Sequence, residues 1–154
     1  MRTPQEPHAT GPSTDVMGRQ LDPDETDDPD LGWLYTHPRV LVVDDDEDTR
    51  DLVAAMVRSR GMSVVTASDG PSGVEAAMSG PFDVIIVDVV MPGVDGIEVL
   101  HEIHAHVDST VPVVTMTAQP RRALKSTSLS QGAVAHLRKP LRRSVLINVI
   151  DELL

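Results

Sequence analysis

The stretch Val84–Gly96 reads VIIVDVVMPGVDG, and its order of residue types decides the fold. Its first four residues are all β-branched and lack polar alternation, which predicts a strand buried on both faces of a parallel sheet. The run ends at a single carboxylate, Asp88, and Pro92 and Gly93 then turn the chain towards a new helix. Asp88 therefore stands at the carboxyl end of a buried strand, where open α/β sheets bind their ligands.

Strand and helix patterns alternate on both sides of this stretch. Apolar runs predict further strands at 40–43, 63–67, 111–116 and 133–138. Helical spacing of apolar residues predicts helices at 46–60, 70–79, 97–106, 121–130 and 142–154. Five strands that alternate with five helices through short connections indicate an α/β fold, a doubly wound parallel sheet with helices on both faces.

The same spacing predicts which side of each helix faces the sheet. We expect inward positions at Leu52, Val53, Met56, Val57, Val74, Ala77, Met78, Ile97, Leu100, Ile103, Val145, Leu146, Val149, Ile150 and Leu153. Ile147 and Leu154 fall on the outer side of the last helix. The helix at 121–130 has only a thin apolar side, and we expect it to be the most mobile of the five.

The charge balance limits the classes of partner. The chain has 154 residues with 13 Lys and Arg, 24 Asp and Glu, and a net charge of −11. Such an acidic chain disfavours binding to nucleic acid and to anionic membranes, which both need basic surface. It has no Cys, which excludes disulfides and Cys-ligated zinc. No apolar run approaches a membrane span or a signal-peptide core, so we expect a cytoplasmic protein.

Residues 1–36 differ in composition from the rest. They are rich in Pro and carry an acidic run at 22–30, with few apolar residues and no period. Such a segment cannot bury enough surface to offset the entropy of ordering it, so we expect a disordered acidic tail before a folded domain at 37–154. The apolar patch at 31–35 is interpreted as a segment docked on its own domain or as a contact for a partner.

Polar residues stand at the carboxyl ends of four predicted strands: Asp44 and Asp45, Asp88, Thr117, and Lys139. A parallel sheet gathers these ends at one edge, so we expect all five side chains in one cleft. Three neighbouring carboxylates repel one another unless a cation neutralises them or one is protonated. Oxygen ligands without Cys or His favour Mg²⁺.

A carboxylate beside such an ion can act as a nucleophile towards phosphorus. Asp88 ends the middle strand and is the best-placed nucleophile, with Asp44 and Asp45 as metal ligands. Val90 lies where only its backbone carbonyl could reach the metal. Lys139 and the Thr117 hydroxyl would then stabilise charge on the phosphoryl oxygens.

Four separated motifs resemble the receiver domain of two-component response regulators, here of the single-domain type. They are VLVVDD at 40–45, DVVMPGVDG at 88–96, MTA at 116–118 and KP at 139–140. The resemblance implies a flavodoxin-like strand order of 2-1-3-4-5. It also implies that Asp88 accepts a phosphoryl group from a sensor histidine kinase or a phosphotransferase with Mg²⁺. Asp44, Asp45 and Asp88 would bind the metal, Thr117 would sense the phosphoryl group and Lys139 would pair with it.

The implied output is a change in the face formed by the helix at 121–130, the strand at 133–138 and the last helix. This face would control a downstream protein partner or form a homodimer. The family usually has Tyr or Phe at the switch position three residues before the Lys, where this chain has His136. Imidazole is smaller and polar, so we expect a weaker or pH-dependent switch at His136.

Two other functions stay open on the sequence. A phosphohydrolase of the haloacid-dehalogenase type would use Asp44 as nucleophile and Asp46 as acid and base, but Asp48 departs from that motif and a cap domain is missing. A phosphorylation-independent binding module is the other alternative. The leading interpretation is a signalling protein that is no enzyme beyond its own phosphorylation and dephosphorylation.

The chain also has a local basic surface at Arg121, Arg122, Lys125, Arg142 and Arg143. Such residues are interpreted either as ordinary solvated helix starts or as a surface for an acidic partner.

Overall fold

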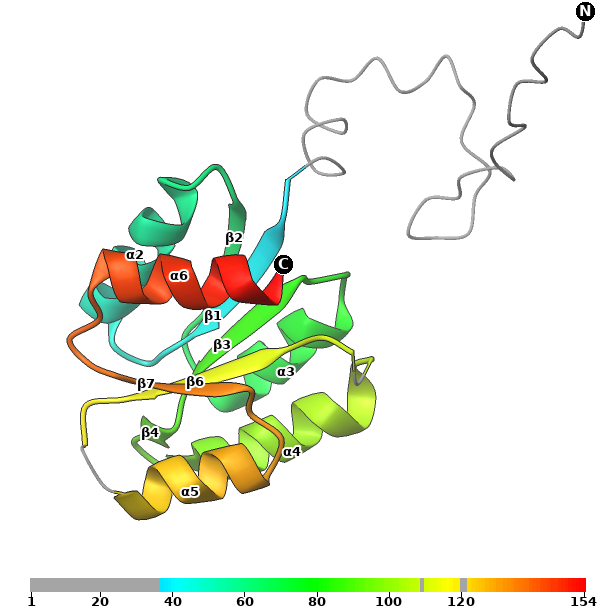
Figure 1. The fold of residues 1–154 in the computed structure, drawn as a ribbon. Coiled ribbons are helices and arrows are strands. Elements are labelled where there is room, and N and C mark those ends of the chain that lie inside the picture. Colours follow the sequence, from blue (N-terminus) through cyan, green and yellow to red (C-terminus); the bar gives the residue numbers. More distant parts are fainter. Residues whose placement is uncertain (1–36, 109, 120–121) are drawn as a thin grey trace, which may run out of the picture. The chain divides into compact units, whose positions relative to one another are not determined.

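The buried run at 84–88 forms the central strand, β3 (Val84–Asp88), of a five-stranded sheet (Figure 1). Its neighbours are β1 (Arg39–Val43) and β6 (Val113–Thr117), and β2 (Ser63–Ala67) and β7 (Ala135–Arg138) lie at the edges. The order is β2-β1-β3-β6-β7 and all pairs are parallel. This confirms the predicted doubly wound sheet and its strand order.

The computed structural model describes residues 37–108, 110–119 and 122–154. The predicted tail at 1–36, including the apolar patch at 31–35, lies outside the described residues, as does Arg121. None of the described helices is both long and apolar enough to cross a membrane.

The five predicted helices are present as α2 (Glu47–Arg58), α3 (Gly70–Met78), α4 (Gly96–His106), α5 (Arg122–Ser130) and α6 (Arg143–Leu153). Three of them begin at an Asp whose carboxylate accepts a hydrogen bond from a backbone N–H of the first turn: Asp46, Asp69 and Asp95. Such caps satisfy amide groups that have no partner inside the helix. Asp46 and Asp95 therefore set helix starts beside the strand ends that carry the candidate site.

The helices form two layers, one on each face of the sheet. Figure 1 shows α2 and α6 on one face and α3, α4 and α5 on the other. Alternate residues of β1 and β3 point to opposite faces, so that Val42 and Ile86 join the core under α2 and α6, while Val43 and Val87 join the core under α3 and α4. Because both faces are covered, β3 is apolar at every position before Asp88.

Several predicted helix faces were wrong. Leu52, Met78 and Val145 were expected inward but are 50%, 58% and 45% exposed, and Ile97 is only partly buried. Conversely, Ile147 was expected on the outer side of α6 but is buried with Leu146 and Ile150. In α6 apolar residues occur on both sides of the helix, so their spacing alone does not decide which side faces the core.

Some boundaries also differ from the predictions. The strand expected at 111–116 is β6 at Val113–Thr117, because the Val111 amide donates to Asp108 O in a turn. The strand expected from 133 begins at Ala135, because the amide of residue 133 donates to Ser128 O at the end of α5. After β3, where only a turn was predicted, β4 (Val90–Met91) and β5 (Val94–Asp95) pair across Pro92-Gly93, and Gly93 has a positive φ of 70°.

Candidate functional site

The carboxyl ends of β1, β3 and β7 meet at one edge of the sheet and bring three polar side chains together. The Lys139 Nζ atom lies 2.6 Å from Asp44 Oδ2 and 2.8 Å from Asp88 Oδ2. Asp44 is fully buried and Asp88 is 3% exposed. Buried charges of this kind are stable only when they are paired, so the single ammonium of Lys139 holds two carboxylates at the floor of the site.

The pKa values of Asp88 and Lys139 are both raised, but for different reasons. Burial raises the pKa of the Asp88 carboxyl, and the Asp44 charge adds to this effect, against the hydrogen bonds from Lys139 and the Val90 amide. Burial alone would lower the pKa of Lys139, but hydrogen bonds and charge from Asp44 and Asp88 raise it above its ordinary value. Lys139 is therefore a firmly protonated cation beside a carboxylate that is costly to ionise.

Asp45 completes an acidic cluster at this edge. One carboxylate oxygen from each of Asp44, Asp45 and Asp88 lies within 4.8 Å of the others, and Asp45 is exposed. Asp44 Oδ2 is buried and has no aligned hydrogen bond, although it contacts the Lys139 ammonium. A set of three neighbouring carboxylates, one of them exposed, fits a hard divalent cation such as Mg²⁺.

Backbone groups hold the two buried carboxylates in place. Asp44 Oδ1 accepts a hydrogen bond of 2.9 Å from the Asp46 amide. Asp88 Oδ1 accepts one of 2.9 Å from the Val90 amide. Each carboxylate therefore has one oxygen fixed by the loop that follows its strand and the other oxygen directed to Lys139. For Val90 the described contact is made by its amide, and the predicted role of its carbonyl stays a prediction.

The loop after β3 is shaped by a close approach at Gly96. A Cβ atom at this position would lie 2.2 Å from Val89 Cα and 2.7 Å from the Asp88 carbonyl oxygen. Only a residue without a side chain lets the start of α4 pack this tightly against the strand end. Gly96 thus sets the path of the segment that carries Asp88 and Val90.

Thr117 ends β6, the strand beside β3 and β7. It is 1% exposed, and its Oγ1 accepts a hydrogen bond of 3.0 Å from the Gln119 amide. Its backbone carbonyl accepts a hydrogen bond of 2.8 Å from the Lys139 amide. The main chain therefore connects Thr117 directly to Lys139.

His136 of β7 contacts a residue that the sequence prediction missed. His136 Nδ1 lies 2.8 Å from the Oγ1 atom of Thr115, which is fully buried in β6 opposite His136 in the strand register. Burial lowers the pKa of His136, and the nearby charge of Lys125 lowers it further. A hydroxyl residue two positions before Thr117, in an otherwise apolar strand, was the sequence signal for this contact, because residues i and i+2 share a face.

The structure argues against the hydrolase alternative. Asp46, which would be the acid and base, is the N-cap of α2, and its Oδ2 accepts hydrogen bonds from the amide and hydroxyl of Thr49. Its Oδ2 atom is thus engaged in a helix cap, which opposes a role in proton transfer at Asp44.

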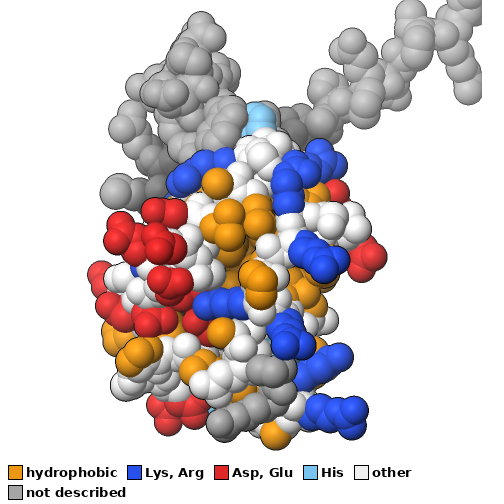
Figure 2. Space-filling view, turned by 90° about the vertical axis from the view of Figure 1, so that its left-hand side faces the viewer, with side chains coloured by type: hydrophobic (Ala, Val, Ile, Leu, Met, Phe, Trp, Pro, Cys, Tyr) orange, Lys and Arg blue, Asp and Glu red, His pale blue; other side chains and the backbone are white. Residues whose placement is uncertain are grey.

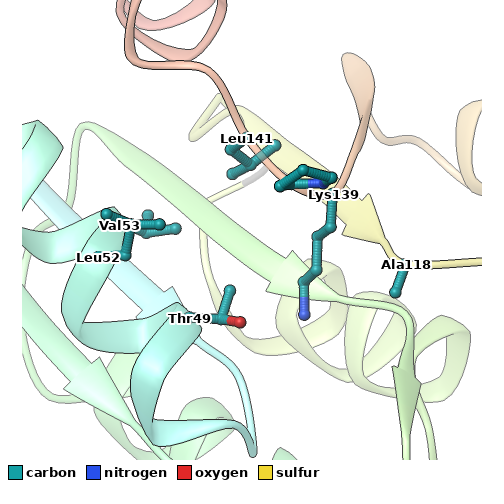
Figure 3. A pocket seen from close by; sticks show the side chains of 7 residues that line it. Thr49, Leu52, Val53, Ala118, Lys139 and Leu141 are labelled. Carbon is teal, nitrogen blue, oxygen red and sulfur yellow. The ribbon is translucent and has the colours of Figure 1, made fainter.

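A pocket of about 260 Å³ opens beside Lys139 (Figure 3). Its lining comes from α2, from the end of β6 and from the segment after β7: Thr49, Leu52, Val53, Ala118, Lys139, Pro140 and Leu141. Lys139 is the charged residue in an otherwise mostly apolar lining, and its ammonium points away from Leu141 in Figure 3. The acidic cluster is therefore flanked by apolar surface.

Comparison with known proteins agrees with this geometry. The model of a family described as the response regulator receiver domain matches residues 40–151. The chain belongs to this family. Receiver domains bind Mg²⁺ at a cluster of Asp carboxylates, and this chain has such a cluster at Asp44, Asp45 and Asp88. Receiver domains are signalling modules and not enzymes of the ordinary kind, and they interact with histidine kinases and downstream effectors.

Relatives of very different length match this receiver domain. It is 31% identical to Protein PilH of Pseudomonas aeruginosa over 75% of this chain and 97% of that protein. It is 33% identical to the transcriptional activator protein PfeR of the same species, over 76% of this chain and 38% of PfeR. The chain thus spans less than half the length of PfeR but nearly all of PilH.

Solved structures share the same fold. Chemotaxis protein CheY4 of Vibrio cholerae has a TM-score of 0.72 and 29% identity, covering 77% of this chain and all of that one. Response regulator TrrA of Thermotoga maritima, solved in complex with Mg²⁺–BeF, has a TM-score of 0.69 and 28% identity, covering 76% of this chain and 99% of TrrA.

Proposed function

We propose that this protein is a phosphoacceptor that receives a phosphoryl group on Asp88 from the phosphohistidine of a sensor kinase or phosphotransferase. The observation that carries the proposal is the contact of the Lys139 ammonium with the buried carboxylates of Asp44 and Asp88, at 2.6 and 2.8 Å. A buried Asp with a raised pKa beside a fixed cation is typical of a reactive carboxylate.

In the proposed reaction an Asp88 carboxylate oxygen attacks the phosphorus atom. A P–O bond forms while the P–N bond to the donor histidine breaks, and the imidazole nitrogen keeps the electron pair. Asp44, Asp45 and Asp88, with the Val90 carbonyl, would hold Mg²⁺, which supplies positive charge for the phosphoryl oxygens when bound. Lys139 supplies a second positive charge, and the Thr117 hydroxyl a hydrogen bond.

The signal would then pass from Thr117 to His136. Movement of the Thr117 hydroxyl towards the phosphoryl group requires it to give up the 3.0 Å hydrogen bond from the Gln119 amide. Gln119 stands in the segment that leads to α5, so this exchange couples the site to that helix. His136 on the neighbouring strand would complete the change, and the α5–β7–α6 face would control a partner protein.

The direct test is phosphorylation of the full chain with acetyl phosphate and Mg²⁺, followed by peptide mapping by mass spectrometry. We expect one phosphoryl group on Asp88 and none in Asp88→Asn. Asp48→Asn is the matched control, because Asp48 is an exposed carboxylate in the first turn of α2, and it should be labelled like the wild type. Label on Asp44 would instead support a hydrolase.

Beryllofluoride provides a second readout that does not depend on a phosphodonor. With Mg²⁺ it should shift NMR signals around Asp88 and in α5, β7 and α6 of the wild type. An unchanged spectrum, together with a lack of label on Asp88, would overturn the proposal and favour a binding module that works without phosphorylation.

A further inference from the structure

The charges of this acidic chain are divided unevenly along the sequence. Residues 109–150 contain no Asp and no Glu. The same stretch holds Arg121, Arg122, Lys125, Arg138, Lys139, Arg142 and Arg143, which are seven of the 13 Lys and Arg. Apart from Lys139, which belongs to the acidic cluster, the described members lie on α5, on β7 and at the start of α6. We call Arg122, Lys125, Arg138, Arg142 and Arg143 the basic face.

All five residues of the basic face are exposed. Figure 2 shows Lys and Arg side chains gathered along one side of this view of the molecule, while Asp and Glu gather along the opposite side. Among the acidic residues, Asp45, the N-cap Asp46 and the first α2 residue Glu47 are exposed. The molecule thus presents two surfaces of opposite charge at the rim of the candidate site.

The basic face is not neutralised within the domain. Within the described parts of the chain, no carboxylate lies at ion-pair distance from any of its five residues. Arg143 donates a hydrogen bond of 2.8 Å from Nε to the neutral Ser59 hydroxyl. Solvated surface cations on a folded domain more often alternate with anions, which makes an unpaired group of five an exception.

Three of these cations also occupy positions that are unfavourable for helix stability. Arg122 is the first residue of α5, Arg142 is the N-cap of α6 without a side-chain cap bond, and Arg143 is the first residue of α6. The helix dipole places positive partial charge at these N-termini, where anions stabilise and cations destabilise. Neither helix has an acidic residue in its first turn. These three cations of the basic face therefore lower the stability of α5 and α6.

Exposed apolar surface adjoins the basic face. Val145 of α6 is 45% exposed and lies three residues after Arg142, on the same side of the helix start, because the helix turns Leu146 and Ile147 towards the core instead. Val149, one turn later on the same side, is partly exposed. Charged residues around a small apolar strip are typical of a surface that binds another protein.

We propose that the partner of the α5–β7–α6 face is an acidic protein segment with apolar side chains, held by the basic face and by Val145. This inference rests on the proposed function, in which that face carries the output. A second copy of the chain would bring two sets of five cations together, and they would outnumber Glu152, the exposed anion on the Val145 side of α6. Nucleic acid would place its phosphates near the acidic start of α2 and would find no exposed aromatic side chain among the described residues for stacking on the bases.

The test uses the full chain with Mg²⁺ and beryllofluoride and a fluorescent synthetic peptide of Glu and Leu at helical spacing. We expect binding that weakens as salt is added, and that weakens about tenfold or more in the double variant Arg122→Glu/Arg142→Glu. Both substitutions place an anion at a helix N-terminus, so folding should be preserved. Neither residue contacts the candidate site.

The matched control is Arg58→Glu/Arg60→Glu, which makes the same change in net charge at the end of α2, where Arg60 pairs with Asp151 at the surface. It should alter peptide affinity less than about twofold. Equal losses in both double variants would show a general charge effect and overturn the proposal. So would equal binding of a Lys and Leu peptide, or tighter binding of a DNA duplex.

Sedimentation of the beryllofluoride-treated protein tests whether a second copy of the chain occupies the basic face. A dimer that forms in the wild type and dissociates in Arg122→Glu/Arg142→Glu would show that a second copy covers the face, and would also overturn the proposal. NMR signals of the Asp88 region report beryllofluoride binding in each sample. If these NMR signals do not shift when beryllofluoride is added, the proposed function fails. If they shift normally but the peptide does not bind, only this inference fails.

Discussion

The proposed reaction makes two opposing demands on Asp88, because this residue is buried and would have to be ionised to attack phosphorus. Burial raises its pKa, so its ionisation opposes folding. A raised folded-state pKa contributes stability that is present at low pH and is lost as the pH rises through that pKa. We therefore predict that Asp88→Asn is more stable than the wild type at pH 7 without metal, on the order of 1 kcal/mol.

Urea unfolding in metal-free buffer between pH 7 and pH 4 would measure this difference. It should shrink as the pH falls towards 3.8, the ordinary value for Asp. The exposed Asp48→Asn provides the control and should show little change at any pH. A variant less stable than the wild type at pH 7 would mean that the ion pair with Lys139 outweighs the cost of burial.

His136 provides a second prediction for a single residue. Burial and the charge of Lys125 lower its pKa below the ordinary 6.5, so the folded protein favours the neutral ring. The stability from this preference is present above pH 6.5 and is lost as the pH falls through the folded pKa. We predict an NMR titration midpoint below 6.5 that moves upward in Lys125→Gln. Arg122→Gln should leave it in place, and a midpoint at or above 6.5 in the wild type would contradict the prediction.

Among the elements, the strands could be predicted from sequence more securely than the helix faces. A buried parallel strand is a continuous apolar run, so β1 and β3 were visible, and their ends placed Asp44 and Asp88 at one edge. The contact of Lys139 with both of them follows from that topology. In α6 apolar residues occur on both sides, so spacing could not decide whether Val145 or Ile147 faces the core. Thr115 was missed because its only sequence signal was its spacing of two residues from Thr117, and that spacing does not show which residue of the neighbouring strand it contacts.

The loop from β3 to α4 gives a prediction at Gly96. Replacement by Ala would place Cβ 2.2 Å from Val89 Cα, against backbone that cannot rotate away. We expect Gly96→Ala to cost about 1–3 kcal/mol and to weaken Mg²⁺ binding by moving Asp88. At Gly80 the added Cβ would meet only the flexible end of Arg39. Gly80→Ala should therefore change the stability and the Mg²⁺ affinity by much less. Urea unfolding and Mg²⁺ titration would measure the two effects, and equal costs would refute this account.

The strength of the proposed switch would depend on β7 and its neighbours. A shift from 1:99 to 99:1 between two states needs about 5.5 kcal/mol of differential interaction, and His136 is already hydrogen bonded to Thr115 in this state. We predict that His136→Tyr gives larger beryllofluoride-induced NMR shifts in α5, β7 and α6 than the wild type. Thr115→Val tests the cause, because it removes the hydrogen bond and keeps the ring. Equal shifts in the wild type and His136→Tyr would contradict the prediction.

At the scale of the whole molecule, metal should stabilise a protein that is already folded. Binding to the folded state alone adds about 2.7 kcal/mol at a free ion concentration of one hundred times Kd. We predict that Mg²⁺ raises the unfolding temperature, that a chelator reverses this rise without unfolding the chain, and that Asp45→Asn reduces it. Thermal unfolding with Mg²⁺ and with chelator would show the effect, and loss of the near-ultraviolet signal on chelation would contradict it.

The position of the Lys139 ammonium between Asp44 and Asp88 has a consequence for how such a protein persists in a cell. The Lys139 ammonium already neutralises part of the carboxylate charge, so we expect a newly made chain to fold without the ion. Supply of magnesium would then limit when the molecule can react, while its survival would be independent of that supply. Lys139 would therefore make the stability of the fold independent of Mg²⁺ while the reaction still depends on it.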